Sequence, residues 1–565
     1  MTSADRARPD APAAGPVLGR RTFLGSAAAV AAVAAGGGLL TACTSASGGS
    51  PAKGGVATGK ALADVLPAYL PSQVVTPDIP GQNGASPGFL TFPAEFESSV
   101  RGKAGKGGAY TVISPLWGAV PEKGSKYFSA LNEAIGADLT FQQQDGNTYQ
   151  DKIGAVLASD DIADIVVIPG WNLNGRIPDA VSAKFADLGP YLAGDAVKKY
   201  PNLAAIPTGA WQMSVFGGKL RGLPMPSSPL GGEIVYYRAD VFEKNGYTVP
   251  TSPDAFLSLA KEITDAKAKV WACDDMWYSA QILFGCVPGT APNYWQLKDG
   301  KLVHLVETPE YLEAMEWTRK LFAAGVVHPD AVAATNDSKT RFTSGQTLMM
   351  NDGSAAWYGL TFEQAKPNPE FRIKGMDFFG AQGGDPVLYL GNQAGIFSFL
   401  NKKLSKDRIE ECLAIADFCA APFGTKEYLL VQYGVEGVHY TRDSKGTPTK
   451  TERGIKEVVS SYEFIASPDK AIAYPDHPEV VRDYCAWMAR NAAFAKKPLF
   501  FNMQIQEPTR FASLYNSFDD LRKDVHRGRK KMSDVQSAVS DWRRNGGDQL
   551  RDFYQQILDR SGSGA

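Results

Sequence analysis

Several groups of residues in this chain have side chains that could take part in catalysis, but each group lacks the structural context or the spacing that catalysis needs. Gly84-Ala85-Ser86-Pro87-Gly88 matches the pattern of a serine nucleophile on a sharp turn, yet neither flank reads as the required strand or helix. Adjacent acidic residues diverge on a helix or strand instead of converging on one substrate; such pairs are Asp160-Asp161, Asp274-Asp275 and Asp519-Asp520. The five histidines lack metal-ligand spacing. We therefore predict no catalytic residues, no resident metal and no cofactor.

The N-terminus has the features of an export signal. Arg20-Arg21 precedes an apolar, small-residue stretch from Ala27 to Leu40, which ends in Leu40-Thr41-Ala42-Cys43. The paired arginines resemble the twin-arginine signal, and Leu-Thr-Ala-Cys resembles the lipobox of bacterial lipoproteins. Residues 1–42 are thus predicted to be a twin-arginine lipoprotein signal peptide, with Cys43 lipidated on the extracytoplasmic face of the cell membrane. The alternative is a plain N-terminal anchor helix with a chance cysteine.

Composition and charge narrow the class of protein. Hydrophobic residues make up 44% of the 565 residues and charged residues 21%, as in an ordinary globular protein of two or more packed units. The 58 Lys and Arg nearly balance the 60 Asp and Glu, which argues against a nucleic-acid binder. Beyond the first 45 residues no apolar run reaches the roughly 20 residues that a membrane-spanning helix needs. Cys273 and Cys286 could pair, but an odd number of cysteines remains after Cys43, so a disulfide framework is excluded.

The elements that must position any site begin near Tyr110. Residues 43–106 are rich in Ser, Gly, Ala and Pro and are predicted to be a flexible linker. The following segments alternate strand, helix, strand, helix and strand, which predicts an α/β unit with a parallel sheet; they are 110–116, 127–135, 139–142, 147–157 and 165–168. Ligands of such sheets bind beyond the carboxyl ends of the strands. Trp117 and Trp171 stand just after the first and third strands, so we predict that both contact a ligand.

A family resemblance is carried by four segments in order. Residues 217–257 run from Gly-Gly-Lys-Leu-Arg-Gly-Leu-Pro through Val-Tyr-Tyr-Arg-Ala-Asp-Val-Phe to a Pro-capped helix, and they resemble the hinge passage of extracellular solute-binding proteins of sugar-importing ABC transporters. Residues 157–165, 342–349 and 433–441 resemble the same family. The last of these segments and the long C-terminal tail resemble its large aldouronate-type lipoprotein subgroup. The resemblance covers residues 107–560.

This resemblance implies a two-lobed, periplasmic-binding-protein-like α/β fold with hinge strands and a cleft between the lobes. The expected first lobe comprises residues 107–230 and 336–385, and the expected second lobe residues 231–335 and 386–565. The implied function is to capture an oligosaccharide in the cleft by hinge closure and to deliver it to membrane permease subunits. The protein would be a monomer, not an enzyme and without nucleic-acid partners.

Sugar sites combine aromatic rings, which stack on C–H faces, with carboxylates and amides, which bond hydroxyls. Beside the two tryptophans, the resemblance and the local pattern nominate further ligand-binding candidates: Tyr236, Trp277, Asp352, Trp357, Asn392, Gln393, Glu436 and His439. Some have a structural alternative, since Tyr236 could pack in the hinge, Trp277 could lie on a surface helix, and Glu436 and His439 could shape a loop. Trp357 also departs from the family pattern, in which the aromatic stands closer to the glycine of this turn.

Two other classes of function compete with solute binding. An exported polysaccharide-active enzyme, a glycoside hydrolase or lyase, would need two carboxylates placed on one substrate. A surface adhesion or signalling module would keep the lobes but lack a transporter partner. Neighbouring genes for two permease subunits would separate that module from a transport protein.

Overall fold

The computed structural model describes residues 57–122, 124–230, 233–288, 292–332, 337–381, 384–444 and 446–561. The predicted signal peptide and Cys43 lie outside these residues. Among the described helices, none is long and apolar enough to cross a membrane.

The first sheet confirms the predicted α/β alternation. Its strand order is β3-β2-β4-β15-β7, and β2 runs parallel to both β3 and β4; the strands are β2 (Ala109–Leu116), β3 (Asp138–Asp145), β4 (Ile165–Pro169), β7 (Gly222–Pro226) and β15 (Ala394–Leu400). The helices α2 (Lys126–Ile135) and α3 (Tyr149–Ala158) connect the first three strands along the chain. All five residues of β4 are buried, as expected for a strand that is covered on both faces. We call the part of the chain packed around this sheet lobe 1.

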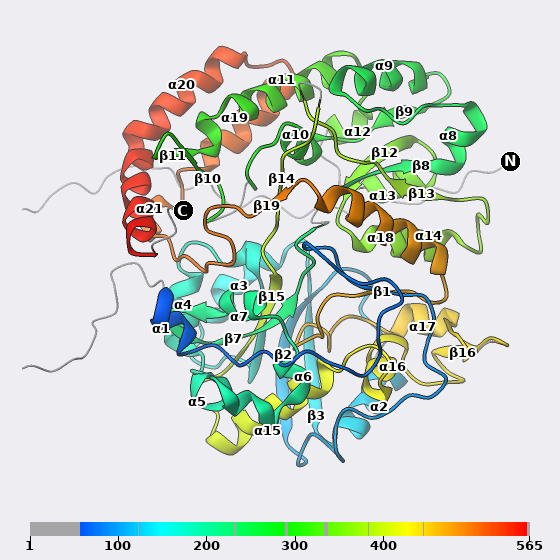
Figure 1. Ribbon diagram of the computed structural model, residues 1–565, viewed down its shortest axis with the longest axis vertical. Helices are drawn as coiled ribbons and strands as arrows, with labels where there is room; N and C mark the ends of the chain where they lie inside the picture. The colour runs from blue at the N-terminus through cyan, green and yellow to red at the C-terminus, as the bar shows by residue number, and fades with distance from the viewer. Residues whose placement is uncertain are drawn as a thin grey trace, which may run out of the picture. The chain divides into compact units, whose positions relative to one another are not determined.

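A second, four-stranded sheet forms the centre of lobe 2. Its strand order is β13-β8-β12-β9, with β12 parallel to β9 and antiparallel to β8; the strands are β8 (Ile234–Arg238), β9 (Trp271–Cys273), β12 (Thr347–Asp352) and β13 (Ile373–Gly375). The Pro-capped helix predicted at the end of the hinge passage is α9 (Pro253–Ile263), and α11 (Pro309–Ala323) also begins with a proline. In Figure 1 the strands of this sheet are grouped apart from β2, β3, β7 and β15.

Strand pairing corrects the expected division of the chain into lobes. Residues 336–385 were assigned to lobe 1, but β12 pairs with β8 and β9 in lobe 2. Conversely, β15 lies between β4 and β7 in lobe 1, although residues from 386 onward were assigned to lobe 2. A run of apolar residues fits the interior of either sheet, so the sequence pattern alone does not determine which sheet each strand joins.

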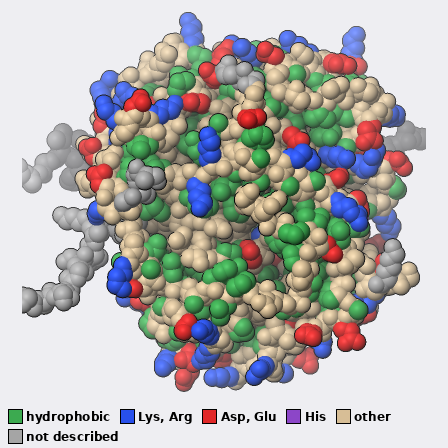
Figure 2. Space-filling view, viewed as in Figure 1, with side chains coloured by type: hydrophobic (Ala, Val, Ile, Leu, Met, Phe, Trp, Pro, Cys, Tyr) green, Lys and Arg blue, Asp and Glu red, His purple; other side chains and the backbone are tan. Residues whose placement is uncertain are grey.

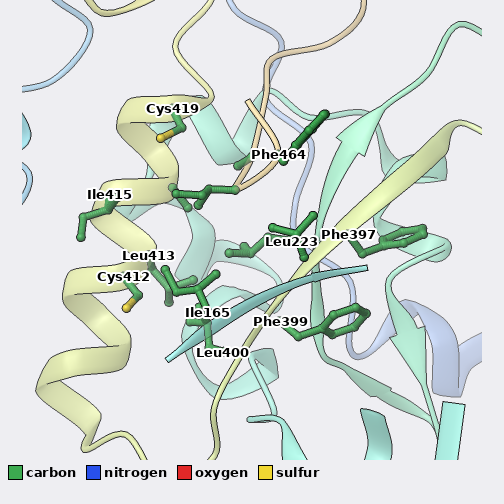
Figure 3. Close-up of a cluster of buried hydrophobic side chains, with 14 of the residues drawn as sticks. Ile165, Leu223, Phe397, Phe399, Leu400, Cys412, Leu413, Ile415, Cys419 and Phe464 are labelled. Carbon is green, nitrogen blue, oxygen red and sulfur yellow. The ribbon is translucent and has the colours of Figure 1, made fainter. Parts of the chain in front are cut away.

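Helix α15 (Lys406–Cys419) follows β15 and covers the first sheet. Its apolar residues join the same buried cluster as the strands, and Figure 3 shows Leu413 on this helix beside Ile165 and Leu400. Cys412 and Cys419 are buried free thiols in this cluster. The return of the chain to lobe 1 therefore ends in a packed layer of helix on sheet.

Residues 57–106, which we call the N-terminal arm, are not the flexible linker that their composition suggested. The arm contains α1 (Gly59–Ala63), and its strand β1 (Gly88–Phe89) pairs in parallel with β18 (Ile472–Ala473). At the end of the arm the Glu411 carboxylate accepts hydrogen bonds from the backbone N–H groups of Lys106 and Gly108, at 2.6 and 3.0 Å. A segment without a core of its own is thus held by backbone pairing and by carboxylates of the folded body.

The chain returns to lobe 2 through α18 (Pro478–Ala492) and ends in three helices, α19 (Asn516–His526), α20 (Met532–Trp542) and α21 (Asp548–Ser561). Val535, Trp542, Leu550 and Tyr554 of these last helices are all buried in the lobe 2 core. Trp295 lies between the last two helices, with its ring centre 6.3 Å from Trp542 and 5.4 Å from Tyr554. The C-terminal tail is therefore an integral layer of lobe 2.

The face of the molecule seen in Figure 2 carries charges of both signs. Figure 2 shows Lys and Arg side chains interspersed with Asp and Glu over the visible face. This distribution agrees with the net charge of −2.

A buried ion pair fixes the end of β9 in lobe 2. Asp274 follows that strand and accepts two hydrogen bonds from Arg341 on α13 (Ser338–Thr343), with Nη2 2.5 Å and Nε 3.0 Å from Oδ1. Both side chains are almost fully buried.

We predict that Asp274→Asn lowers the free energy of unfolding by about 3–5 kcal/mol, because it removes the negative charge that balances the buried Arg341 guanidinium at this position. The matched control is Asp64→Asn, which removes an exposed ion pair with Lys60 and should cost about 1 kcal/mol or less. Urea titration measures both values. Equal losses in the two variants would contradict the assignment of Asp274 to a structural role.

Candidate functional site

The candidate site lies where the edges of the two sheets are joined by the chain. The strands β4 and β7 both run antiparallel to β15, so their carboxyl ends lie at the same edge of the first sheet, where β15 begins. The chain leaves this edge after Pro226 and enters the second sheet at Ile234. Ile234 pairs with Asp352, so β12 and the parallel β9 end where β8 begins. Side chains at these two edges therefore flank the crossing between the lobes.

On the lobe 1 edge, two tryptophans form an exposed aromatic pair. Trp117 follows β2 and is 41% exposed, while Trp171 lies in the short helix after β4 and is 56% exposed. Their ring centres are 5.8 Å apart at an angle of 54°. The chain turn at Gly146 lies directly against the Trp117 ring, where an added Cβ would be only 2.4 Å away. The predicted position of both residues at the strand ends is confirmed, and their contact with a ligand stays a prediction.

The lobe 2 edge carries carboxylates and a tyrosine, whereas the lobe 1 edge carries the two tryptophans. Glu233 lies just before β8, and Asp352 ends β12 with its carboxylate 3.4 Å from the Lys339 ammonium. Burial and the neighbouring Asp352 charge raise the pKa of Glu233 to about 7, while a hydrogen bond from Asn351 lowers it in part. Tyr278, next to Trp277, is 59% exposed. Glu233 and Tyr278 are not among the residues predicted from the sequence; the signal that points to them is their position just before β8 and after β9.

Two of the aromatic residues predicted to bind the ligand are packed inside lobe 2. The Tyr236 side chain is fully buried; its hydroxyl donates to the Gly353 carbonyl at 3.1 Å, and its ring meets Trp357 edge to face at 5.7 Å. Trp357 is itself stacked on Tyr484 with ring centres 5.1 Å apart. Neither ring has a free face for a sugar, so the structural alternative foreseen for Tyr236 fits, and Trp357 has the same role.

Trp277 also differs from its predicted position. It begins α10 (Trp277–Leu283), is almost fully buried, and meets Tyr311 edge to face at 5.3 Å. Its other contacts are His526, at 5.2 Å between ring centres, and the Arg522 guanidinium, 5.5 Å from its ring. Successive helical residues point about 100° apart, so the exposed position falls to Tyr278 instead.

Asn392 and Gln393 belong to an amide network that fixes the second crossing between the lobes. Asn392 Oδ1 accepts from Asn293 Nδ2 and from the Asn502 backbone N–H, both at 3.0 Å. Gln393 Oε1 accepts from Asn502 Nδ2 at 2.7 Å, and Ser227 of the first crossing donates its N–H to the Gln393 carbonyl at 2.9 Å. The amide groups are therefore engaged with one another, although Gln393 also lines a cavity of about 120 Å³.

Glu436 and His439 shape a loop of lobe 1. Glu436 accepts hydrogen bonds from the Tyr440 hydroxyl at 3.2 Å and from Arg442 Nε at 3.1 Å. His439 is fully buried, accepts the Val435 N–H at Nδ1, and places Nε2 3.1 Å from the Glu457 carboxylate. Of the two roles that the sequence left open, these contacts favour loop shaping over ligand binding.

No group of three or more His, Cys, Asp or Glu side chains within the described ranges could hold a metal ion. Cys273 and Cys286, which could have formed a disulfide, are two separate buried thiols. The site thus offers stacking surfaces on one edge and hydrogen-bonding carboxylates on the other.

Comparison with known proteins places this geometry in a family. A family model described as bacterial extracellular solute-binding protein matches residues 126–434. The polygalacturonan/rhamnogalacturonan-binding protein YtcQ of Bacillus subtilis (strain 168) is 22% identical over 483 residues, which cover 82% of this chain and 94% of that protein. Lipoprotein LipO of the same organism is 23% identical over 369 residues, 61% of this chain and 70% of its own length.

The fold has counterparts among solved structures. The alginate-binding protein AlgQ2, in a crystal structure without calcium ion, superposes with a TM-score of 0.61 over 82% of this chain and 100% of its own, at 12% identity. The fold is that of two-lobed solute-binding proteins, as predicted.

The raised pKa of Glu233 predicts how the stability of the protein depends on pH. The folded state binds this proton more tightly than the unfolded chain, whose glutamate pKa is about 4.3. Stability is therefore lost as the pH rises from about 4.5 through 7. We expect Glu233→Gln, which cannot ionise, to lose less melting temperature than the wild type between pH 5 and pH 8. Glu363→Gln, at an exposed position, is the control, and the prediction fails if all three proteins lose the same amount.

Proposed function

The chain belongs to the bacterial extracellular solute-binding protein family, and we propose that it captures an oligosaccharide between its lobes and delivers it to the permease subunits of an ABC importer. The single observation that carries the choice of ligand is the exposed pair Trp117 and Trp171 at the carboxyl ends of β2 and β4. Two large indole side chains exposed side by side are unusual on a protein surface unless a ligand or a partner covers them in the functional state.

The chemistry of the two edges suits a sugar. Indole rings offer flat apolar faces to the C–H groups of a pyranose, and the pair on lobe 1 leaves both rings accessible. Carboxylates bond hydroxyl groups strongly, and Glu233 and Asp352 stand on the lobe 2 edge. A ligand that contacts both edges favours the closed arrangement by the difference in its contacts between the open and closed states. We propose that capture proceeds by this hinge closure.

We further propose that the ligand is bound and not cleaved, and that the protein acts as a monomer. Solute-binding proteins release their ligand intact, and family membership supports this role. The named ligands of one relative make polygalacturonan and rhamnogalacturonan fragments the first compounds to test.

The N-terminal features support attachment to the membrane. We propose that residues 1–42 are a twin-arginine signal peptide, and that Cys43 carries the lipid that holds the protein on the extracytoplasmic face. The Leu40-Thr41-Ala42-Cys43 sequence and the similarity to lipoprotein LipO support this proposal. Mass spectrometry of the membrane-extracted protein would test it directly, since a lipidated chain begins at Cys43.

Thermal-shift measurements on residues 46–565 test the choice of ligand. Galacturonic-acid oligomers, rhamnogalacturonan fragments and neutral plant oligosaccharides are compared, and a ligand at about a hundred times its Kd should add roughly 2.7 kcal/mol of stability. A stabilising sugar recovered intact supports the proposal. A sugar that is consumed points to an enzyme, and a shift with peptides alone would reject the sugar.

We predict that Trp171→Ala weakens binding of the stabilising sugar roughly tenfold or more, because the stacking and the buried area of an indole face are both lost. The unliganded melting temperature should barely move, since the ring is 56% exposed. Isothermal titration calorimetry measures the affinity. Tyr69→Ala, at another exposed aromatic position, is the matched control and should bind as the wild type does; equal affinities in all three proteins would remove Trp171 from the site.

A further inference from the structure

We infer that the N-terminal arm is a strap that is fastened to lobe 1 at both ends and restrains the motion of lobe 2 through β1. The inference concerns lobe motion, goes beyond the proposed function and does not depend on which solute is bound.

The first end of the arm is attached to lobe 1 by backbone hydrogen bonds. The N–H of Ala68 donates to the Gly194 carbonyl at 3.0 Å, and the N–H of Gly194 returns a bond to Leu66 at 2.9 Å. Two residues further on, the N–H of Leu70 donates to the Ala204 carbonyl at 2.8 Å. The buried Leu66 side chain joins the lobe 1 core, so this end moves with lobe 1.

The second end is attached to lobe 1 by two carboxylates. Glu427 on α16 (Lys426–Tyr433) accepts from both Ser98 and Ser99, including the Ser99 N–H at 3.0 Å. Glu411 on α15 accepts from the N–H of Lys106 at 2.6 Å. Both ends of the arm are therefore attached to lobe 1, and neither end is free to move with lobe 2.

The middle of the arm lies between the two lobes. Gly88 packs on α18 of lobe 2, where an added Cβ would be 2.6 Å from the Cys485 sulfur and 3.1 Å from Val481. The next residue, Phe89, faces the other way and stacks on Phe423 of lobe 1 with ring centres 4.4 Å apart. One two-residue strand thus contacts both lobes, and its lobe 2 face is a glycine without a side chain.

This contact lies beside the crossings on which the lobes turn. Strand β1 pairs with β18, which leads from lobe 1 into α18. Residues 84–87 of the arm line the 120 Å³ cavity together with parts of all three crossings; these are Ser227, Ser228, Pro229, Gln393, Asp469 and Lys470. When lobe 2 turns about the crossings, α18 must move across β1, because lobe 1 holds both ends of the arm. The absence of a side chain at Gly88 lets α18 approach β1 closely, and the packing of the neighbouring Ile79 and Leu90 against the lobe 2 cluster opposes this movement.

A reversible crosslink tests this inference. In Gly88→Cys the new Cβ would lie 2.6 Å from the sulfur of the native Cys485, so oxidised glutathione should join the arm to lobe 2 by a disulfide. The protein used is residues 46–565, with dyes on azidophenylalanine at the exposed positions Lys402 in lobe 1 and Lys261 in lobe 2. Single-molecule energy transfer without ligand then reports the distances between the lobes. We expect the disulfide to narrow the distance distribution and to slow exchange at least tenfold, and dithiothreitol to restore both.

The matched control is Gly88→Cys combined with Cys485→Ser, which cannot form the crosslink and should not respond to oxidation. An oxidised, crosslinked protein with the same distribution and exchange rate as its reduced form would overturn the inference. Failure of the folded Gly88→Cys variant to form the crosslink would overturn it as well. Because no ligand is present, these outcomes are independent of the outcome of the sugar screen.

A second variant tests the attachment of the arm to lobe 1. Ser98→Ala with Ser99→Ala removes hydroxyl donors to Glu427, which should loosen the second end of the arm and speed lobe exchange roughly three- to tenfold. Ser72→Ala, at an exposed position of the same arm, is the control and should leave the rate unchanged. Equal exchange rates in the Ser98/Ser99 variant and the wild type would contradict a restraining role.

Discussion

The antiparallel strand β15, inserted between β4 and β7, is the constraint on which the arrangement of the lobes depends. It pairs with both neighbours along nearly its whole length, and its buried residues join the largest core cluster. Lobe 1 is incomplete until this strand arrives, and the chain forms all of the second sheet before it does so. The crossings between the lobes are therefore fixed to the edge where β15 begins, which is also the edge that carries Trp117 and Trp171. Hinge and candidate site share one edge of the sheet for this reason.

The candidate site differs from the rest of the molecule in how its aromatic side chains are used. Trp295, Trp357 and Trp487 are buried with their faces covered by other rings, which is how most large side chains contribute to stability. Trp117 and Trp171 forgo that burial although the strand residues just before them are buried. Leaving large apolar rings exposed at two neighbouring strand ends sacrifices transfer free energy in the ligand-free protein. A ligand that covers both rings recovers it.

The sequence allowed the fold class to be predicted because local patterns report burial directly. The continuous apolar run at residues 165–168 and the helical pattern of residues 147–157 both appear in the structure as expected, as β4 and α3. The pairing of the strands could not be predicted from the sequence in the same way. Strand β12 is apolar enough to fit either sheet, and only its pairing with β8 shows that it belongs to the second sheet. Among the candidate ligand-binding residues, Trp171 and Tyr236 are both aromatic residues beside a predicted strand, and the sequence does not distinguish them. Trp171 follows the end of β4 and is exposed, whereas Tyr236 lies within β8 and is buried.

The ordered arm changes how a lipid anchor would act. A free linker of residues 43–106 would let the binding body range far from the membrane, whereas the arm is already held to lobe 1 from about residue 66 and is described from Ala57 onward. A lipid on Cys43 would then be separated from Ala57, which packs against the lobe 1 core, by a segment that spans about 50 Å at most, even when fully extended. The Pro-rich composition of this stretch predicts a flexible tether, but the stretch is attached to the folded body, because its backbone groups hydrogen-bond to lobe 1 and to β18. Tethering and hinge restraint would thus depend on one continuous segment of the chain.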